Sequence, residues 1–589
     1  MKSQFLLSGL LGLAGLVSAG RNSNSGDAFL KRHMPEFSAQ HLNRRATAAA
    51  EPKNQTGEVL PPRFRNNGTE SEDGLQCGRI ANSDLTEFYV DGKKLPLINW
   101  DVGESYAGNL PITDKKNETS ELFFWFFPTA TKEFVEKKEI VIWLNGGPGC
   151  SSLLGFLEEN GPIAWGEGME KPKRNPFSFH LLSNIVWLEQ PVGVGFTKGN
   201  ETIYNEDDIA KQFIGFWKNF VKTFGMEGWK VYIAGESYAG MYGPYLAKHM
   251  LDQEDKTYYD MSGLLVYDGI SWGETLQSAP VAFPYLDQHY SLMPIDQPAF
   301  NKLRDLDKSC GFADFRNEYF VYPPKGQIPP QLPHTKVHPN GSYVDRDCAQ
   351  IFDLVWIEAL KKNPCFNIYN IVDRCPERND PLSGKDSWFN RRDVQSAIHV
   401  KPHVKWAQCK QVFPEGVDDQ SEPAGVYALP QVIDQTKNVI IAEGTSDYLL
   451  SLNGILLGIQ NMTWGGKLGF QQAPSDPFYV PAYGFDPEQL LTGEGDPNFY
   501  ANELPAGYGV MGTTHHERGL SFVVSQLAGH EGPEYTPSAS FRILEKLLGR
   551  IDSLTQVSAF TLPQISNVTQ PKGELGNGTV KIPCWTRDC

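Results

Sequence analysis

One stretch constrains the fold of this 589-residue chain more than any other: the hexapeptide Gly-Glu-Ser-Tyr-Ala-Gly at 235–240. An apolar, strand-like run at 229–234 precedes it, and a helix-like run at 241–251 follows it. A strand, a sharp turn between small residues and a helix form the setting in which a nucleophilic serine, here Ser237, protrudes from the edge of a sheet. The strict pattern Gly-x-Ser-x-Gly ends in glycine, where this chain has Ala239, so the motif needs support from its surroundings.

The same hexapeptide occurs earlier in the chain, at 103–108. Pro111 and a polar run follow this copy, and they do not favour a helix start packed against a sheet. Residues 119–127 then have the pattern of a strand. We therefore expect Ser105 to be an ordinary residue of a hairpin and Ser237 to be the nucleophile.

Charge and composition exclude some classes of function. The formal net charge is −17 and the pI is about 5.3, which argues against a nucleic-acid partner, because a surface that neutralises phosphates is not evident. The same charge is compatible with an acidic compartment. No His-Glu-x-x-His motif or Cys/His cluster suggests a metal, so we expect no metal site and no cofactor.

Both ends of the chain indicate passage through the secretory pathway. Residues 1–19 have the pattern of a signal peptide, with Lys2, an apolar run at 5–17 and small residues at the cleavage site. After them, no stretch is apolar for long enough to insert in a membrane. Dibasic pairs at 31–32 and 44–45 make 20–45 a candidate propeptide, although they are equally compatible with exposed basic pairs. A polar arm is expected at 46–75, and a glycosylated polar tail at 551–589.

Modification sites agree with this route. Eight Asn-x-Ser/Thr sequons are candidate glycosylation sites: Asn54, Asn67, Asn117, Asn200, Asn340, Asn461, Asn567 and Asn577. Nine cysteines fit an oxidising compartment, and their odd number leaves one free or intermolecular. We expect the protein to be secreted or to reach a vacuole-like or lysosome-like lumen.

Buried strands alternate with helices along the chain, and strands are predicted at 139–144, 184–188, 437–442 and 520–527. This alternation predicts an α/β fold with a mixed, mostly parallel sheet flanked by helices. The predicted core has two halves, 76–274 and 401–550. Between them, residues 275–400 are rich in Pro, Asp and Asn and contain four of the nine cysteines. We interpret them as a disulfide-bearing insertion that shapes a substrate cleft.

A serine nucleophile needs a histidine to take its proton and a carboxylate to orient that histidine. In α/β hydrolases these residues follow the serine in the order acid, then histidine, each after a strand. Asp447 and His530 follow the predicted strands 437–442 and 520–527 in that order. We therefore expect Ser237, Asp447 and His530 to form the catalytic set.

Several residues compete for these roles. Glu443 and Asp434 are rivals of Asp447, but the side chain of Glu443 should emerge before the turn. His515 and His516 are rivals of His530, but we expect them in an exposed polar loop at the wrong end of the strand.

A glycine-rich loop at 145–152 follows the buried strand 139–144. Bare backbone N–H groups just after a strand suit an oxyanion hole, the set of donors that stabilises a tetrahedral intermediate. A phosphate-binding loop is the competing interpretation, but the chain lacks the Gly-Lys-Ser/Thr that such loops carry.

Several motifs together resemble the serine carboxypeptidases, the family of carboxypeptidase Y, over roughly residues 85–550. The motifs are Trp-Leu-Asn-Gly-Gly-Pro-Gly-Cys-Ser-Ser-Leu at 143–153, Glu-Asn-Gly-Pro at 159–162, Glu-Gln-Pro-Val-Gly-Val-Gly-Phe at 189–196, the hexapeptide at 235–240, and Gly-His at 529–530 with Pro533. The resemblance implies an α/β-hydrolase fold and the release of single C-terminal residues from peptide substrates through an acyl-enzyme, favoured at acid pH.

The resemblance also implies roles for individual residues. Ser237 would be the nucleophile, His530 the base and Asp447 its partner, and the N–H groups of Gly147 and Tyr238 would form the oxyanion hole. The residues that would hold the substrate's terminal carboxylate are Asn145, Glu159 and Glu236, with Trp143 and Gly146 close by. A carboxylate facing two carboxyl groups is repelled unless at least one of them keeps its proton, which proximity and burial favour.

The chain departs from the family pattern at two positions. Thr445 stands where the family usually has a second Asp, two residues before the triad Asp. Glu531 stands where the family often has Met, and it either favours basic residues in the substrate or points to solvent. The resemblance also implies that Cys150 is disulfide-bonded, with Cys409 and Cys77 as alternative partners.

Two other functions remain compatible with this sequence. Relatives that share the acyl-enzyme transfer the acyl group to an alcohol, so an acyltransferase is the first alternative. The second is an inactive secreted glycoprotein on the same scaffold, against which the intact set of serine, histidine, aspartate and oxyanion glycines argues.

Overall fold

The structure is a computed structural model that describes residues 85–200, 202–330, 332, 345–373, 380–383, 387–481 and 507–562. The predicted signal peptide, candidate propeptide and polar arm lie outside these residues, as does most of the C-terminal tail. Among the helices of the described ranges, none combines the length and the apolar character needed to cross a bilayer.

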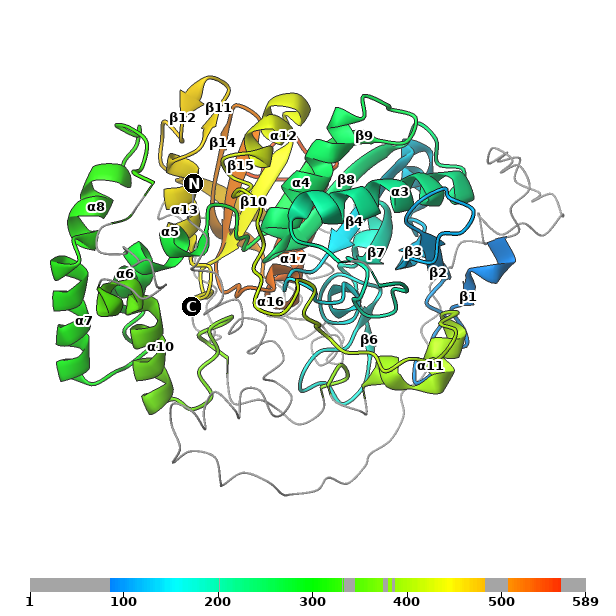
Figure 1. Cartoon of the computed structure of the whole chain (residues 1–589), viewed down its shortest axis with the longest axis horizontal. Coiled ribbons are helices and arrows are strands. Elements are labelled where there is room, and N and C mark those ends of the chain that lie inside the picture. Colours follow the sequence, from blue (N-terminus) through cyan, green and yellow to red (C-terminus); the bar gives the residue numbers. More distant parts are fainter. Residues whose placement is uncertain are drawn as a thin grey trace, which may run out of the picture.

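A large mixed sheet runs through the centre of the described chain (Figure 1). Its strands lie in the order β1 (Tyr89–Asp91), β2 (Glu104–Pro111), β3 (Glu121–Phe127), β7 (Asn184–Glu189), β4 (Glu139–Leu144), β8 (Lys230–Glu236), β9 (Asp260–Tyr267), β10 (Val439–Gly444), β15 (Leu520–Ser525), β14 (Gly509–Glu517) and β13 (Asp476–Val480). Neighbours from β7 to β15 pair in parallel, and those on either side pair antiparallel. This arrangement confirms the predicted α/β-hydrolase fold.

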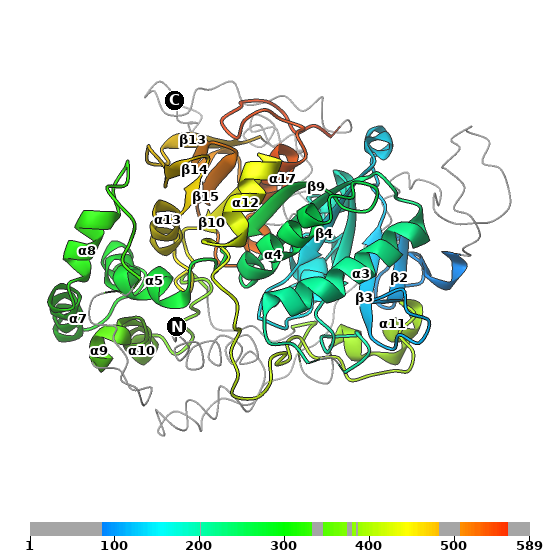
Figure 2. The same ribbon diagram turned by 45° about the horizontal axis from the view of Figure 1, so that its top comes forward.

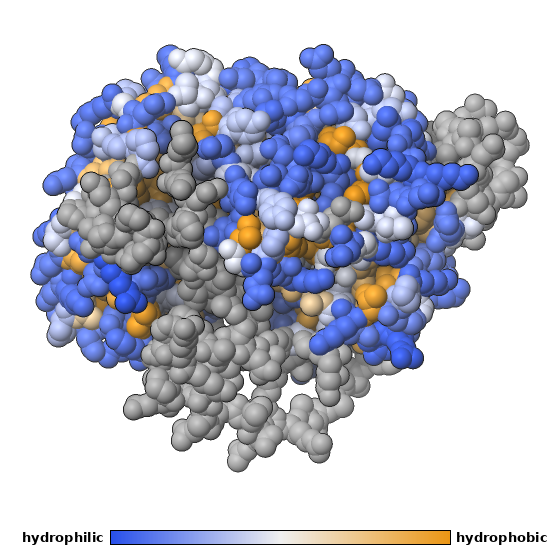
Figure 3. All heavy atoms as spheres, viewed as in Figure 1, coloured by the Kyte–Doolittle hydropathy of each residue, from blue (hydrophilic) through white to orange (hydrophobic). Residues whose placement is uncertain are grey.

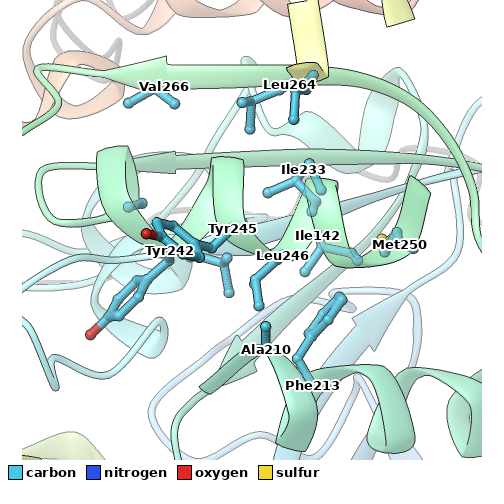
Figure 4. Packing of buried hydrophobic residues seen from close by; sticks show 14 of the residues in the cluster. Ile142, Ala210, Phe213, Ile233, Tyr242, Tyr245, Leu246, Met250, Leu264 and Val266 are labelled. Atoms are coloured by element: carbon cyan, nitrogen blue, oxygen red, sulfur yellow. The ribbon is translucent and has the colours of Figure 1, made fainter. Parts of the chain in front are cut away.

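The central strands are continuous apolar runs because both of their faces are buried. In β4, Ile140 and Ile142 point into one apolar core, whereas Val141 and Trp143 point into the other. The helices α3 (Glu206–Phe224), α4 (Ala239–Asp252), α12 (Ala428–Thr436) and α13 (Leu452–Gln460) pack on the first face, and α17 (Pro537–Leu547) on the second (Figures 1 and 2). Figure 4 shows side chains of α3 and α4 packed between these helices and the strands of the sheet.

Helix α3, which follows strand β7 in the sequence, shows why its residues form a helix. Asn205 caps the start of α3 by accepting a hydrogen bond from the Asp208 N–H, and Gly225 ends the helix in the left-handed conformation. Its aromatic side chains at helical spacing are buried against the sheet and include Phe213 and Phe220.

Much of the predicted insertion forms a helical unit beside the sheet, on the left in Figure 1. Its helices are α5 (Glu274–Ser278), α6 (Ala282–Gln288), α7 (Gln297–Ser309), α8 (Phe312–Tyr319), α9 (Arg346–Ala349) and α10 (Ile351–Lys362). They enclose an apolar cluster of their own, and a disulfide joins Cys310 to Cys348. The predicted disulfide-bearing insertion is therefore present.

The last part of the segment 275–400 packs elsewhere. The turn η7 (Trp388–Asn390) and α11 (Arg392–Ala397) lie near β1, on the opposite side of the sheet from α7 (Figure 1). The Trp388 indole donates to the Pro96 carbonyl at 2.9 Å, and His399 Nε2 lies 2.9 Å from the Tyr89 carbonyl oxygen. These contacts join this stretch to the core rather than to the helical unit.

Short elements complete the described fold: η2 (Leu85–Glu87), η3 (Lys132–Lys137), η4 (Gly155–Glu159), β5 (Ile163–Ala164), β6 (Lys173–Arg174), η5 (Phe179–Leu181), η6 (Ala279–Val281), β11 (Thr463–Trp464), β12 (Lys467–Leu468) and α16 (Gly532–Tyr535). The surface in Figure 3 is mostly hydrophilic, with scattered apolar side chains. Of the candidate glycosylation sites, Asn117 and Asn200 are exposed, Asn461 is half-buried, and the other five lie outside the described residues.

Candidate active site

Ser237 lies in the sharp turn between β8 and α4, as its motif predicts. Its φ of 59° is in the left-handed region, which is strained for a residue with a side chain. The turn holds it there because the Ser237 N–H donates to the Tyr267 carbonyl at 2.9 Å, and its carbonyl accepts from the Gly240 and Ile270 N–H groups. Ser237 remains partly exposed in this position.

The turn also explains why alanine is tolerated at the last position of the motif. A methyl group added at Gly235 would lie 2.7 Å from the Ala239 Cβ and 2.4 Å from the Leu144 carbonyl oxygen. The turn therefore needs glycine at 235, where the space is missing, and accepts the extra methyl group at 239.

The earlier copy of the hexapeptide has a different structure. Ser105 is a buried residue of β2, which pairs antiparallel with β3. Its hydroxyl accepts a hydrogen bond from the Trp125 indole at 3.2 Å. The expectation that Ser105 belongs to a hairpin is correct.

Asp447 and His530 meet at the ends of two adjacent parallel strands, β10 and β15. Asp447 Oδ2 lies 2.7 Å from His530 Nδ1, and both side chains are buried. Asp447 Oδ1 accepts from the Leu450 N–H at 3.1 Å, which fixes the carboxylate. The other imidazole nitrogen, Nε2, makes no hydrogen bond to a described residue, and it faces the pocket that Ser237 also lines.

Two opposing effects set the pKa of His530. Burial lowers it, but the charge of Asp447 and the hydrogen bond to Asp447 raise it, and the charges of Glu531 and Asp268 add to the rise. The result is a pKa of about 9. The imidazolium that forms when this histidine takes a proton is therefore strongly stabilised.

The rivals of these residues lie elsewhere. Asp434 is on α12, where it forms an ion pair with Lys437. Glu443 is the penultimate residue of β10, and its buried carboxyl interacts with that of Asp268. Burial raises the pKa of both carboxyls well above the usual range, and the Asp447 charge adds to the rise for each, so the pair retains a proton beside the triad carboxylate.

The expectation for the rival histidines is wrong about the loop. His515 and His516 are residues of strand β14, and His515 is buried, whereas His516 is exposed as expected. His516 pairs with Ser521 near the start of β15, which is the end away from His530, as expected. The run Gly509–Glu517 alternates only weakly between apolar and polar residues, so its sequence resembles a loop, but pairing with β13 and β15 makes it a strand.

The glycine-rich loop approaches the nucleophile turn very closely. A Cβ added at Gly146 would lie 2.4 Å from the Tyr238 nitrogen and 2.7 Å from the Ser237 Cβ. Gly147 follows with a φ of +114°. The backbone of residues 146 and 147 therefore lies beside Ser237 because no side chain intervenes.

Asn145 joins two glutamates into one buried cluster. Its Nδ2 donates to Glu159 Oε1 at 2.9 Å and to Glu236 Oε1 at 2.6 Å. Its Oδ1 accepts from the Trp143 indole at 2.9 Å and from the Gly155 N–H at 3.0 Å, which fixes the orientation of the amide. The second oxygen of each glutamate has no hydrogen-bond partner among the described residues.

Burial raises the pKa of Glu159 to about 7, although its hydrogen bonds oppose the shift. Burial also raises the pKa of Glu236 well above its usual range, and the charge of Glu159 adds to the effect. The Glu531 charge raises both pKa values further. At acid pH the cluster can therefore donate hydrogen bonds from protonated carboxyls.

One pocket brings Asn145 and Glu236 together with Ser237 and His530, whereas Glu159 and Trp143 are not among its lining residues. Its lining includes Asn145, Gly146, Gly147, Cys150, Glu158, Glu236, Ser237, Tyr369, Gln408, His530 and Glu531. Three of these side chains are carboxyls and none is a lysine or arginine. Glu531 does not point into bulk solvent: one of its oxygens is buried and has no hydrogen-bond partner among the described residues.

Some residues of the site have no signal in the sequence. Tyr369 comes from the insertion, and its carbonyl accepts from the His530 N–H at 2.8 Å while its ring packs against the imidazole. Asp268 follows β9 and accepts from the Gly444 N–H at 2.8 Å, next to the triad acid. Cys150 pairs with Cys409, one of its two expected partners.

The comparisons with known proteins agree with this geometry. The family profile described as serine carboxypeptidase matches residues 96–550. The chain is 41% identical over 542 residues to a probable serine carboxypeptidase of Arthroderma benhamiae, which covers 88% of this chain and 95% of the relative. It is 38% identical to the serine-type carboxypeptidase F of Aspergillus niger, over 78% of this chain and 87% of that protein.

Among solved structures, a prohormone-processing carboxypeptidase, Kex1(Δ)p of Saccharomyces cerevisiae, has the same fold. Its TM-score is 0.61 at 21% identity, over 81% of this chain and 99% of that structure. The matched profile extends over most of the chain and includes the nucleophile turn, the glycine-rich loop and both triad strands. The chain is therefore a member of the serine carboxypeptidase family.

Proposed function

We propose that this protein releases single residues from the C-termini of peptides through an acyl-enzyme formed on Ser237. In this proposal His530 is the base and Asp447 its partner, and the N–H groups of Gly147 and Tyr238 hold the oxyanion. Asn145, Glu159 and Glu236, with Trp143 and Gly146 beside them, bind the substrate's terminal carboxylate. The observation that carries the proposal is that Asn145 and Glu236 line the same pocket as Ser237 and His530, with Glu159 bound to the same Asn145 amide.

The reaction would run in two steps. Ser237 Oγ attacks the last peptide carbonyl while His530 Nε2 takes its proton, and the tetrahedral oxyanion is held by backbone N–H groups. Collapse expels the C-terminal amino acid, whose amine receives the proton from His530. Water then attacks the acyl-enzyme by the same route, which frees Ser237 and the shortened peptide.

The carboxylate cluster explains why an exopeptidase results. When a peptide lies across Ser237, the part on the C-terminal side of the scissile bond contacts the cluster. Only a free carboxylate one residue beyond that bond can accept a hydrogen bond from a protonated glutamate whose other oxygen accepts from Asn145. An internal peptide bond offers no such acceptor and leaves the buried donors unpaired, which is costly.

We also propose that acid pH favours substrate affinity, because the cluster must hold a proton to accept a carboxylate. The triad acts in the opposite direction, since a protonated His530 cannot take the serine's proton and its pKa is raised to about 9. We therefore expect KM to be lower at acid pH, and kcat to rise with pH.

Passage through the secretory pathway remains part of the proposal, toward secretion or a vacuole-like lumen. It is supported by the signal-like residues 1–19, the sequons and the disulfides Cys150–Cys409 and Cys310–Cys348, which form in oxidising compartments. Removal of residues 20–45 belongs to the same proposal, and the mass of the mature N-terminus measures it.

A panel of acyl dipeptides tests the activity, assayed from pH 4 to pH 8 with Ser237→Ala as the control. We expect release of the C-terminal amino acid, no cleavage of the matching dipeptide amides, and labelling of Ser237 by a fluorophosphonate. Acyl transfer to an alcohol without hydrolysis would instead support the acyltransferase, and absence of labelling would support the inactive scaffold.

A further inference from the structure

A segment between α11 and α12 contacts both of the loops that carry the proposed oxyanion donors. It comprises residues 406–421 and is named here the brace; in Figure 1 it belongs to the yellow-green trace that joins these two helices. Its first half contacts the glycine-rich loop, and its second half contacts the nucleophile turn. No feature of the sequence assigns it a role.

The brace holds the glycine-rich loop through three consecutive residues. Cys409 forms the disulfide with Cys150, the Ser151 N–H donates to the Gln408 carbonyl at 2.8 Å, and the Lys410 N–H donates to the Gly149 carbonyl at 2.9 Å. The contact is tight: a Cβ added at Gly149 would lie 2.1 Å from the Lys410 oxygen. These backbone contacts begin two residues after Gly147.

The other end of the brace holds Tyr238 through its phenol. The Tyr238 hydroxyl donates to Asp419 Oδ2 at 2.6 Å. The second oxygen of Asp419 accepts from the Ser421 N–H at 2.9 Å and from the Ser421 hydroxyl at 2.6 Å. Ser421 in turn accepts from the N–H of Glu206, the first residue of α3, at 2.7 Å, so Asp419 is itself fixed to the core.

Charge assigns the donor in this bond. Burial raises the pKa of the Tyr238 phenol well above its usual range, and the charge of Asp419 adds to the rise. The phenol therefore keeps its proton and donates to the carboxylate. Burial raises the pKa of Asp419, while its hydrogen bonds from Ser421 and Tyr238 oppose that rise. When the carboxyl is ionised, its bond to the phenol is stronger and shorter than a bond between neutral groups, and the 2.6 Å distance agrees with that.

We propose that the brace sets the position of Tyr238 relative to Gly147, and that Asp419 is a positioning residue that acts through the Tyr238 phenol. The inference rests on the proposed oxyanion roles of these two backbone N–H groups. They come from different loops, after β4 and after β8, and an oxyanion needs both donors within about 2.7–3.1 Å of one oxygen. A single segment bound to both loops fixes that spacing before the transition state forms.

Two substitutions test the phenol bond, Tyr238→Phe and Asp419→Ala. Removing an oxyanion donor costs about 10²–10³ in kcat, so displacing one should cost about tenfold, with KM changed less than about twofold. A peptide aldehyde forms a hemiacetal whose oxygen occupies the hole, so its affinity should fall by the same factor as kcat. Binding of the acyl dipeptide to the corresponding Ser237→Ala double variants should not change.

Two further variants serve as controls. Asp419→Asn keeps an oxygen that accepts from the phenol, and we expect it to restore most of kcat. Tyr245→Phe removes a phenol of the same helix whose hydroxyl donates to the Glu422 carbonyl at 2.8 Å, just beyond the brace. That residue lies two turns from the oxyanion N–H, so kcat should stay within about twofold of wild type.

The proposal is refuted if Tyr238→Phe keeps wild-type kcat, or if it loses substrate and aldehyde affinity equally. Equal losses of kcat in Tyr238→Phe and Tyr245→Phe would also refute it, because the brace would then only support the fold in general. If Asp419→Ala does not fold, Tyr238→Phe decides alone. A wild-type protein whose Ser237 is not labelled by the fluorophosphonate refutes the proposed function itself, whereas labelled and active wild type with unaffected variants refutes only the brace.

Discussion

Replacing Glu159 by glutamine tests the carboxylate cluster most directly. Burial raises the pKa of Glu159 to about 7, so the carboxyl loses its proton near neutrality and then repels a bound carboxylate. One pH unit above that pKa about a tenth of the molecules keep the proton, so affinity for a peptide should fall about tenfold between pH 5 and pH 8. Glutamine cannot ionise and still donates from its amide. The affinity of the variant should therefore decrease much less between pH 5 and pH 8.

The assay is calorimetric binding of an acyl dipeptide to the Ser237→Ala protein, with and without Glu159→Gln, from pH 5 to pH 8. Ser237→Ala prevents turnover, so the dissociation constant is measured without the pH dependence of His530 as a base. The dipeptide amide is the matched ligand, because it has no carboxylate, and its weak binding should not depend on pH.

Stability gives an independent readout with a definite sign. Between pH 4.5, the usual pKa of a glutamate, and about 7 the folded state keeps a proton that the unfolded state releases. The free energy of unfolding therefore falls as pH rises through that window, by up to about 3 kcal/mol for this group. Glu159→Gln should remove much of the fall in denaturant titrations at pH 5 and pH 7.5.

The result that refutes this reasoning is affinity that stays flat from pH 5 to pH 8 in the Ser237→Ala protein. Glu159 would then not face the substrate carboxylate. If affinity falls with rising pH by the same factor in the proteins with and without Glu159→Gln, the titrating group is another member of the cluster. Glu236→Gln should then remove the pH dependence.

Three further substitutions test other parts of the site. Asp447→Asn should lower kcat by about 10⁴ with little change in KM in steady-state assays, because His530 loses the partner that orients it. Gly146→Ala should lower kcat/KM by about 10² or more, since its methyl group would displace the Tyr238 N–H; thermal unfolding checks that the variant is folded, and unchanged turnover would contradict the close approach. Glu531→Met should reduce the ratio of kcat/KM for C-terminal Arg over Leu by about fivefold, as expected for a partly solvated ion pair, and an unchanged ratio would discard a role in specificity.

The fold was predictable because its signals are local. The central strands are continuous apolar runs, and the context of 235–240 separates Ser237 from Ser105 although the two hexapeptides are identical. Pro111 after the first copy and the helix-forming run after the second are enough to distinguish a hairpin from a nucleophile turn.

The weak point of the prediction was strand β14. The polar stretch around His515 and His516 resembles a loop in sequence. A strand near the edge of a sheet need not be apolar, so polarity alone did not distinguish the two. Pairing with β15 on one side and with β13 on the other makes it a strand, and the weak alternation within 509–517 does not signal that pairing. In the same way, Trp388 and α11 fall within the predicted insertion by sequence but pack against the first strands by contact.

The sequence by itself determined the candidate catalytic residues and their order: a serine after one strand, an aspartate and a histidine after two others, and glycines where the backbone must pass closely. These depend on chemical type and on neighbours in the chain. The tertiary structure decided their environment: that Glu159 and Glu236 share the amide of Asn145 and hold a proton, that Asp268 lies behind Asp447, and that Asp419 reaches Tyr238. Apart from the Asn145–Glu159 hydrogen bond, these contacts join residues 91 to 181 positions apart, and no local pattern encodes such proximity or the burial that accompanies it.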